Sequence, residues 1–93
     1  MTDVLLHVGF GNVVAFSRVY AIVSPDSAPV RRMMKHAAEQ NTVIDATCGH
    51  KTKAVIVLDT GWVALSALTP QTLAKRVRNP REPQHDEEDI EEA

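Results

Sequence analysis

The chain has 93 residues, of which 44% are hydrophobic and 24% charged, with one cysteine and a formal net charge of -2. This length allows one small domain, and a single cysteine excludes an internal disulfide bond, as is typical of a reducing compartment. The first residues lack the basic start and apolar run of a signal peptide, and no apolar stretch approaches the roughly 20 residues of a membrane span. We therefore expect a soluble, cytoplasmic protein that makes no membrane contact.

The charges are divided unevenly along the chain. All ten lysines and arginines lie within residues 1–81, which hold five acidic residues, whereas residues 82–93 hold seven acidic residues and no lysine or arginine. We call residues 82–93 the acidic segment. Blocks of like charge repel themselves and are typical of disorder. The sequence therefore predicts an α+β domain over residues 1–79 and an acidic disordered tail over residues 80–93.

The N-terminal half predicts three strands followed by a helix. The stretch LLHVGFGNVVAF indicates two strands joined by a turn, because glycine and asparagine readily adopt the positive φ of tight turns. RVYAIV is rich in β-branched and aromatic residues and predicts a third strand. Apolar residues then recur at helical spacing from Val30 to Ala38, after Ser27 as N-cap and Pro29 in the first turn. We expect this amphipathic helix over residues 28–40.

The C-terminal half predicts three further strands and a short helix. TVIDAT, KAVIVLD and WVALSAL are joined by short connections, which favour an antiparallel meander. Thr69 and Pro70 are a typical helix start, and we expect this helix to end near Val77. The predicted fold is α+β: a small antiparallel sheet with one main amphipathic helix and a short C-terminal helix.

The strand KAVIVLD carries apolar residues on both faces. Ala54, Ile56 and Leu58 point to one side of the sheet, and Val55 and Val57 point to the other. A sheet with one exposed face would alternate apolar with polar residues, and one long helix covers only one face well. We therefore expect a homo-oligomer in which a second copy covers the other face.

No residue pattern indicates catalysis, a metal ion or a cofactor. A catalytic dyad of Cys48 and His50 would need an orienting third group, and Cys48 fits better as a small apolar strand residue. The same two residues with His7 lack the paired ligand spacing of a structural zinc site. GFGN lacks the third glycine and the following helix of a dinucleotide-binding fingerprint, and we place Phe10 of this turn in the core. We predict a protein without a cofactor that is not an enzyme.

Several cations surround a predicted hairpin turn: His50, Lys51, Lys53 and, from another strand, Arg18. Lysine and arginine at phosphates supply the sequence-independent part of the affinity for nucleic acids. Ordinary surface charge explains the same residues about equally well, so both interpretations stay open at this point. The basic residues of the predicted helix lie on its polar face, where a solvated surface is the simpler interpretation.

Three stretches together carry a resemblance to a known family: GFGN, IVSPDSAP and IDAT-x-G-x-x-T-x-AV. The similarity runs without an evident gap from about Leu5 to Val77. With these motifs, the chain resembles the RemA family of bacterial regulators of extracellular-matrix genes. The resemblance implies a DNA-binding transcriptional regulator that assembles into a closed homo-oligomeric ring. Such a ring would present one basic surface many times to double-stranded DNA.

The resemblance also implies which residues bind DNA: Arg18, Arg32, His50, Lys51 and Lys53. Arg18 and Arg32 match the family pattern, but the family's usual GRRTR is GHKTK here, so the other three stand where the family has arginines. Lysine binds phosphate as a point charge and lacks the bidentate fork of arginine. The alternative interpretation is therefore a ring-forming structural or protein-interaction scaffold with weak or no DNA binding. The acidic segment is either a solubilising tail or a competitor for the same cations.

Overall fold

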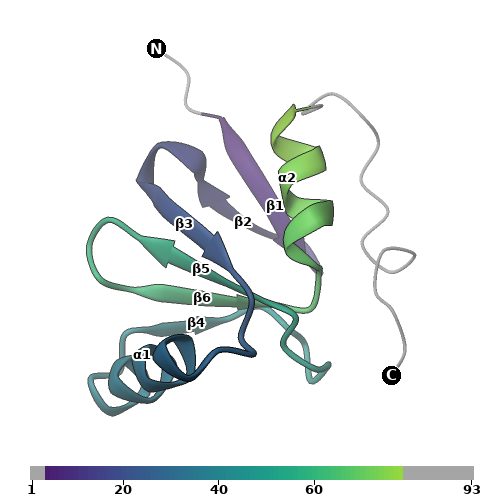
Figure 1. Cartoon of the computed structure of the whole chain (residues 1–93). Helices are drawn as coiled ribbons and strands as arrows, with labels where there is room; N and C mark the ends of the chain where they lie inside the picture. The colour runs from purple at the N-terminus through teal and green to yellow at the C-terminus, as the bar shows by residue number, and fades with distance from the viewer. Residues whose placement is uncertain (1–3, 79–93) are drawn as a thin grey trace.

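The computed structural model describes residues 4–78, so the predicted acidic tail over residues 80–93 lies outside the described residues. β1 and β2 form a two-stranded sheet, and the remaining strands form a four-stranded sheet in the order β3-β5-β6-β4 (Figure 1). The elements in chain order are β1 (Leu5–Gly9), β2 (Asn12–Ala15), the 3-10 helix η1 (Phe16–Arg18), β3 (Val19–Val23), α1 (Ala28–Glu39), β4 (Val43–Asp45), β5 (Ala54–Leu58), β6 (Val63–Ser66) and α2 (Pro70–Arg78). The predicted α+β class is confirmed.

The four-stranded sheet is mixed, so the prediction of an antiparallel meander is wrong. β5 pairs antiparallel with both β3 and β6, but β4 pairs parallel with β6. β4 and β5 therefore lie on either side of β6, and residues 46–53 cross the end of β6 instead of closing a hairpin. The amide of Ala46 donates to the carbonyl of Leu65 (2.9 Å), and the amide of Lys53 donates to the carbonyl of Ser66 (2.8 Å). We call residues 46–53 the basic loop; both of its ends are bonded to β6.

Both predicted helices are confirmed, together with their N-caps. The hydroxyl of Ser27 accepts from the amide of Val30 at 3.3 Å at the start of α1, and Thr69 accepts from the amide of Thr72 at 3.2 Å at the start of α2. These bonds satisfy backbone donors that have no partner within the first helical turn. Neither helix within residues 4–78 is long and apolar enough to cross a membrane.

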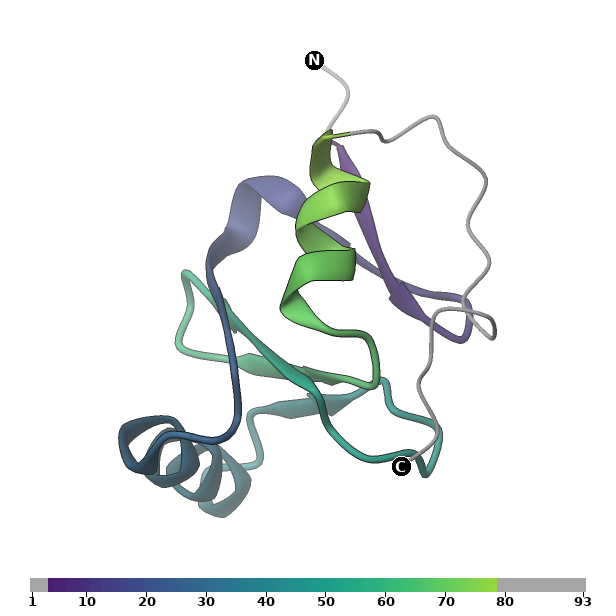
Figure 2. The same cartoon turned by 45° about the vertical axis from the view of Figure 1, so that its right-hand side comes forward.

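Both faces of the four-stranded sheet are covered within one chain. α1 packs on one face, and the β1–β2 hairpin with α2 packs on the other (Figures 1 and 2). Val55 faces the α1 side and Ile56 faces the hairpin side, and each is 0% exposed. The apolar pattern of β5 is therefore satisfied without a second copy. The premise from which we predicted a homo-oligomer is wrong, because the hairpin and α2 cover the face that the predicted main helix leaves open.

Two buried polar side chains fasten β1 over the sheet. The hydroxyl of Ser66 donates to the carbonyl of Val8 at 2.7 Å and accepts from the amide of Leu68 at 3.0 Å. The guanidinium of Arg76, on α2, donates to the carbonyl of His7 at 3.2 Å. A buried polar group is costly unless it is hydrogen-bonded, so these bonds specify where the hairpin and α2 sit.

Candidate nucleic-acid interface

The basic loop begins with a fixed turn. The carboxylate of Asp45 accepts from the hydroxyl of Thr47 at 2.6 Å and from its amide at 2.9 Å. These two bonds, the hydroxyl bond first, lower the pKa of Asp45 below its ordinary value. Cys48 and Gly49 then reverse the chain with φ of +52° and +85°. Cys48 is exposed in this turn, so the prediction that it is an apolar strand residue is wrong.

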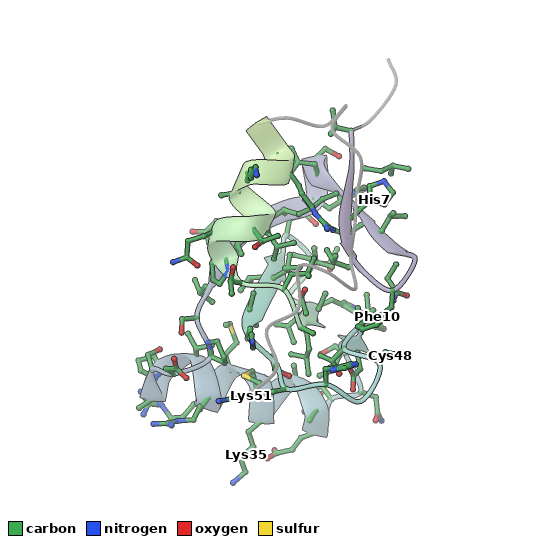
Figure 3. The ribbon with its side chains drawn as sticks, turned by 90° about the vertical axis from the view of Figure 1, so that its right-hand side faces the viewer. His7, Phe10, Lys35, Cys48 and Lys51 are labelled. Carbon is green, nitrogen blue, oxygen red and sulfur yellow. The ribbon has the colours of Figure 1, made fainter. Side chains whose placement is uncertain are left out.

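The turn between β1 and β2 packs against the basic loop. Phe10 has a φ of +54°, which is rare for a bulky residue, and lies between two glycines that also have positive φ. Its ring stacks on the ring of His50, with centroids 5.1 Å apart and planes 13° from parallel. Figure 3 shows Phe10 beside the part of the loop that carries Cys48. Phe10 therefore orients His50 instead of filling the core, and sequence reasoning missed this contact because no local pattern links the two residues.

Lys51 and Lys53 share a shallow cavity of about 350 Å³ at one end of the four-stranded sheet. Its walls are residues 24–26 after β3, residues 51–53 of the basic loop and residues 69–71 at the start of α2. We call it the lysine cavity. Lys51 is exposed and Lys53 is half-buried. Asp26 is the acidic group of the wall, and its carboxylate accepts from the hydroxyl of Ser24 at 3.2 Å.

Arg18 lies at the opposite end of β5. Its guanidinium is 3.5 Å from the carboxylate of Asp59, and the two side chains are 64% and 46% exposed. Lys53 precedes β5 and Asp59 follows it, so a rise of about 3.3 Å per residue separates the two ends by roughly 20 Å. Within one chain, Arg18 is therefore not a fourth member of the cation cluster at the basic loop.

Arg32 lies on the exposed face of α1, as the helical periodicity predicts. α1 starts at Ala28, just beyond the cavity wall at residues 24–26, and Arg32 is about 6 Å farther along the helix axis. Lys51 lies on the part of the basic loop nearer α1, from which Lys35 projects away (Figure 3). Arg32 is thus an exposed cation of α1 outside the wall of the lysine cavity.

The three residues considered for zinc do not meet. Figure 3 shows His7 on β1, well away from Cys48. Among residues 4–78, no three His, Cys, Asp or Glu side chains are grouped as metal ligands.

Comparison with known proteins identifies the family. The sequence model described as "RemA-like: Extracellular matrix regulatory protein A-like" matches residues 5–77. The chain belongs to the RemA-like family. The resemblance carried by GFGN, IVSPDSAP and IDAT-x-G-x-x-T-x-AV is thereby confirmed.

Three relatives match this chain over most of their own length. A protein of Synechococcus elongatus called "Putative regulatory protein" is 54% identical over 81 residues, which are 87% of this chain and 93% of that protein. A relative with the same name from Dictyoglomus turgidum is 55% identical over 73 residues (78% and 86%). Another from Bacillus cereus strain AH187 is 51% identical over 77 residues (83% and 88%). These names describe the relatives as regulatory proteins and mention no enzymatic activity.

Proposed function

We propose that this RemA-like protein is a DNA-binding transcriptional regulator whose copies form a closed ring and present their basic surfaces to double-stranded DNA. The observation that supports it most is the lysine cavity. Lys51 and Lys53 stand on a loop whose ends are bonded to β6, so their backbone positions are fixed before a ligand arrives. A loop whose backbone is already ordered loses less conformational entropy when its lysines bind a phosphate.

The distance between the two cation sites suits a duplex. Phosphates follow one another at about 3.4 Å along each DNA strand, so roughly 20 Å covers about six of them. A duplex that runs parallel to β5 over the surface of the domain can therefore span the distance between Arg18 and the lysine cavity of one chain. Repetition of this pair around a ring would turn a weak contact into a multivalent one.

Salt titration of a double variant tests the proposal. Replacing Lys51→Ala and Lys53→Ala should weaken binding to all DNA sequences alike, because phosphate contacts carry no sequence information. The slope of log affinity against log salt should flatten by about 0.9 for each phosphate that the variant no longer neutralises. The matched control is Lys75→Ala, an exposed lysine of α2 outside the cavity wall. Unchanged affinity and slope in the double variant, at unchanged solution mass, would place the DNA surface elsewhere.

The same titration separates the alternative function. A wild-type protein that keeps its solution mass but binds no DNA at low salt would instead be a protein-interaction scaffold. Trp62, an aromatic side chain that is 40% exposed just before β6, favours this second candidate.

A further inference from the structure

α2 connects the lysine cavity with the acidic segment. The helix begins at Pro70, in the cavity wall, and ends at Arg78. A rise of 1.5 Å per residue places its C-terminal end about 12 Å from the cavity along the helix axis. The chain therefore leaves the described fold about 12 Å, along the helix axis, from the cavity wall at Pro70.

The linker is long enough to return to the cavity. Residues 79–85 separate α2 from the run Asp86–Asp89, in which all four residues are acidic. Seven residues reach up to about 23 Å at roughly 3.3 Å each, which exceeds the axial length of α2, about 12 Å, between Arg78 and the cavity wall at Pro70. A tether of this length gives an effective concentration in the millimolar range at the cavity.

Charge makes the cavity a suitable partner for the acidic segment. Lys51 and Lys53 outnumber Asp26 in the wall, and the exposed Arg31 and Arg32 follow within the first turns of α1. The acidic segment carries seven acidic residues and no lysine or arginine, so its charges repel one another unless cations lie between them. No other part of the chain has a comparable run of acids.

We propose that the acidic segment docks in the lysine cavity of its own chain, where its carboxylates form ion pairs with Lys51 and Lys53. The docked segment shields the two cations that face phosphate in the proposed DNA complex. The consequence for DNA rests on the proposed function: the segment then competes with the duplex and suppresses weak, non-specific binding. Docking itself does not depend on DNA.

The four lysines of the chain give an internal control for a test. Lys51 and Lys53 line the cavity, whereas Lys35 and Lys75 do not. A water-soluble amine-acylating reagent is applied to the full chain, and the acylation rate of each lysine is followed by mass spectrometry. The comparison proteins are the chain that ends at Arg81 and a full-length chain in which all seven acids of residues 82–93 are replaced by Asn or Gln.

If the segment docks, its removal should change the acylation rates of the cavity lysines alone. Removing or neutralising the acidic segment should raise the acylation rate of Lys51 about threefold or more relative to Lys35 and Lys75, because millimolar effective concentration favours the docked state. Lys53 should change in the same direction. At 1 M salt the Debye length falls to about 3 Å, and the difference should disappear. Equal changes at all four lysines, or no change at Lys51, would overturn the proposal.

A crosslink tests whether the segment docks on its own chain. A carbodiimide should join Lys51 to a carboxylate of residues 86–89. In a mixture of nitrogen-14 and nitrogen-15 proteins that have exchanged subunits, the crosslinked peptide pair should carry only one label. Pairs with both labels would overturn docking within the chain.

DNA binding by the same proteins separates this proposal from the function. Protection of Lys51 in proteins that bind no DNA would support docking and refute the DNA function. An unprotected Lys51, with equal DNA affinity for the full and the shortened chain, would refute docking and leave the DNA function standing. If the segment docks and the protein also binds DNA, the shortened chain binds DNA more tightly than the full chain at low salt.

Discussion

At the scale of single residues, the geometry of the basic loop depends on a carboxylate with two hydrogen bonds. Asp45 accepts from the hydroxyl and the amide of Thr47, and both bonds favour its ionised form. The bonds close the turn that leads to Cys48, Gly49 and the cations. Because the pKa of Asp45 is lower in the folded than in the unfolded chain, the turn links folding stability to pH.

The variant Thr47→Val tests this linkage. Val keeps the shape of Thr47 but loses its hydroxyl, so the variant should melt a few degrees below the wild type at pH 7. The contribution of Asp45 is present above its unfolded pKa of about 4 and is lost as the pH falls through the lower folded pKa. The difference in melting temperature between the wild type and Thr47→Val should therefore become smaller as the pH falls from 5 to 2.5. The control Thr60→Val, in an exposed turn, should show no such change, and a constant gap for Thr47→Val would refute the linkage.

At the scale of elements, β5 separates two cation sites, the basic loop before it and Arg18 beside Asp59 after it. The sequence shows the charges of both sites but not the distance between them. The helices and most strands could be predicted, since capping residues and periodicity are local signals. The pairing of β4 with β6 could not be predicted, because tertiary packing decides which strand lies beside the three residues VID of β4. For the same reason, the sequence alone predicts Arg18 near the basic loop. The antiparallel register of β3 on β5 instead places Arg18 beside Asp59.

The pair of Arg18 and Asp59 should weaken DNA binding at its end of β5. The variant Asp59→Asn removes the carboxylate, and DNA affinity should rise about threefold at low salt, in keeping with an exposed ion pair worth less than about 1 kcal/mol. The gain should fade as salt increases. Glu39→Gln makes the same charge change at the end of α1 and serves as the control. An equal gain from both variants would show a general charge effect and no role for this pair.

At the scale of the whole molecule, none of the large apolar side chains that are exposed among residues 4–78 lies on β5. Tyr20 is 81% exposed on β3, which is an outer strand of the four-stranded sheet, and Leu5 on β1 is 54% exposed. Exposed edges and apolar side chains are the usual places at which sheets associate. We therefore expect copies to meet through the edge that carries Tyr20 and not through a face of β5.

Light scattering tests this expectation. The wild type at micromolar concentration should have a mass several-fold above the 10.2 kDa of one chain. Tyr20→Asp should lower that mass, since a carboxylate would be buried in the contact, whereas Tyr20→Phe should leave it unchanged. A wild-type monomer would refute the oligomer, and a Tyr20→Asp protein of wild-type mass would place the contact elsewhere.

Because both ends of the basic loop bond to β6, the lysine cavity forms only after β6 has joined the sheet. Both ends of the loop bond to Leu65 and Ser66, and the third wall of the cavity follows at residues 69–71. During synthesis, the loop leaves the ribosome before the strand that fixes it, so its bonds to β6 form only after that strand has emerged. A chain that is incomplete beyond β5 therefore carries all the lysines of the cavity but has no cavity. The surface that we propose for DNA is thus built late, when nearly the whole domain has folded.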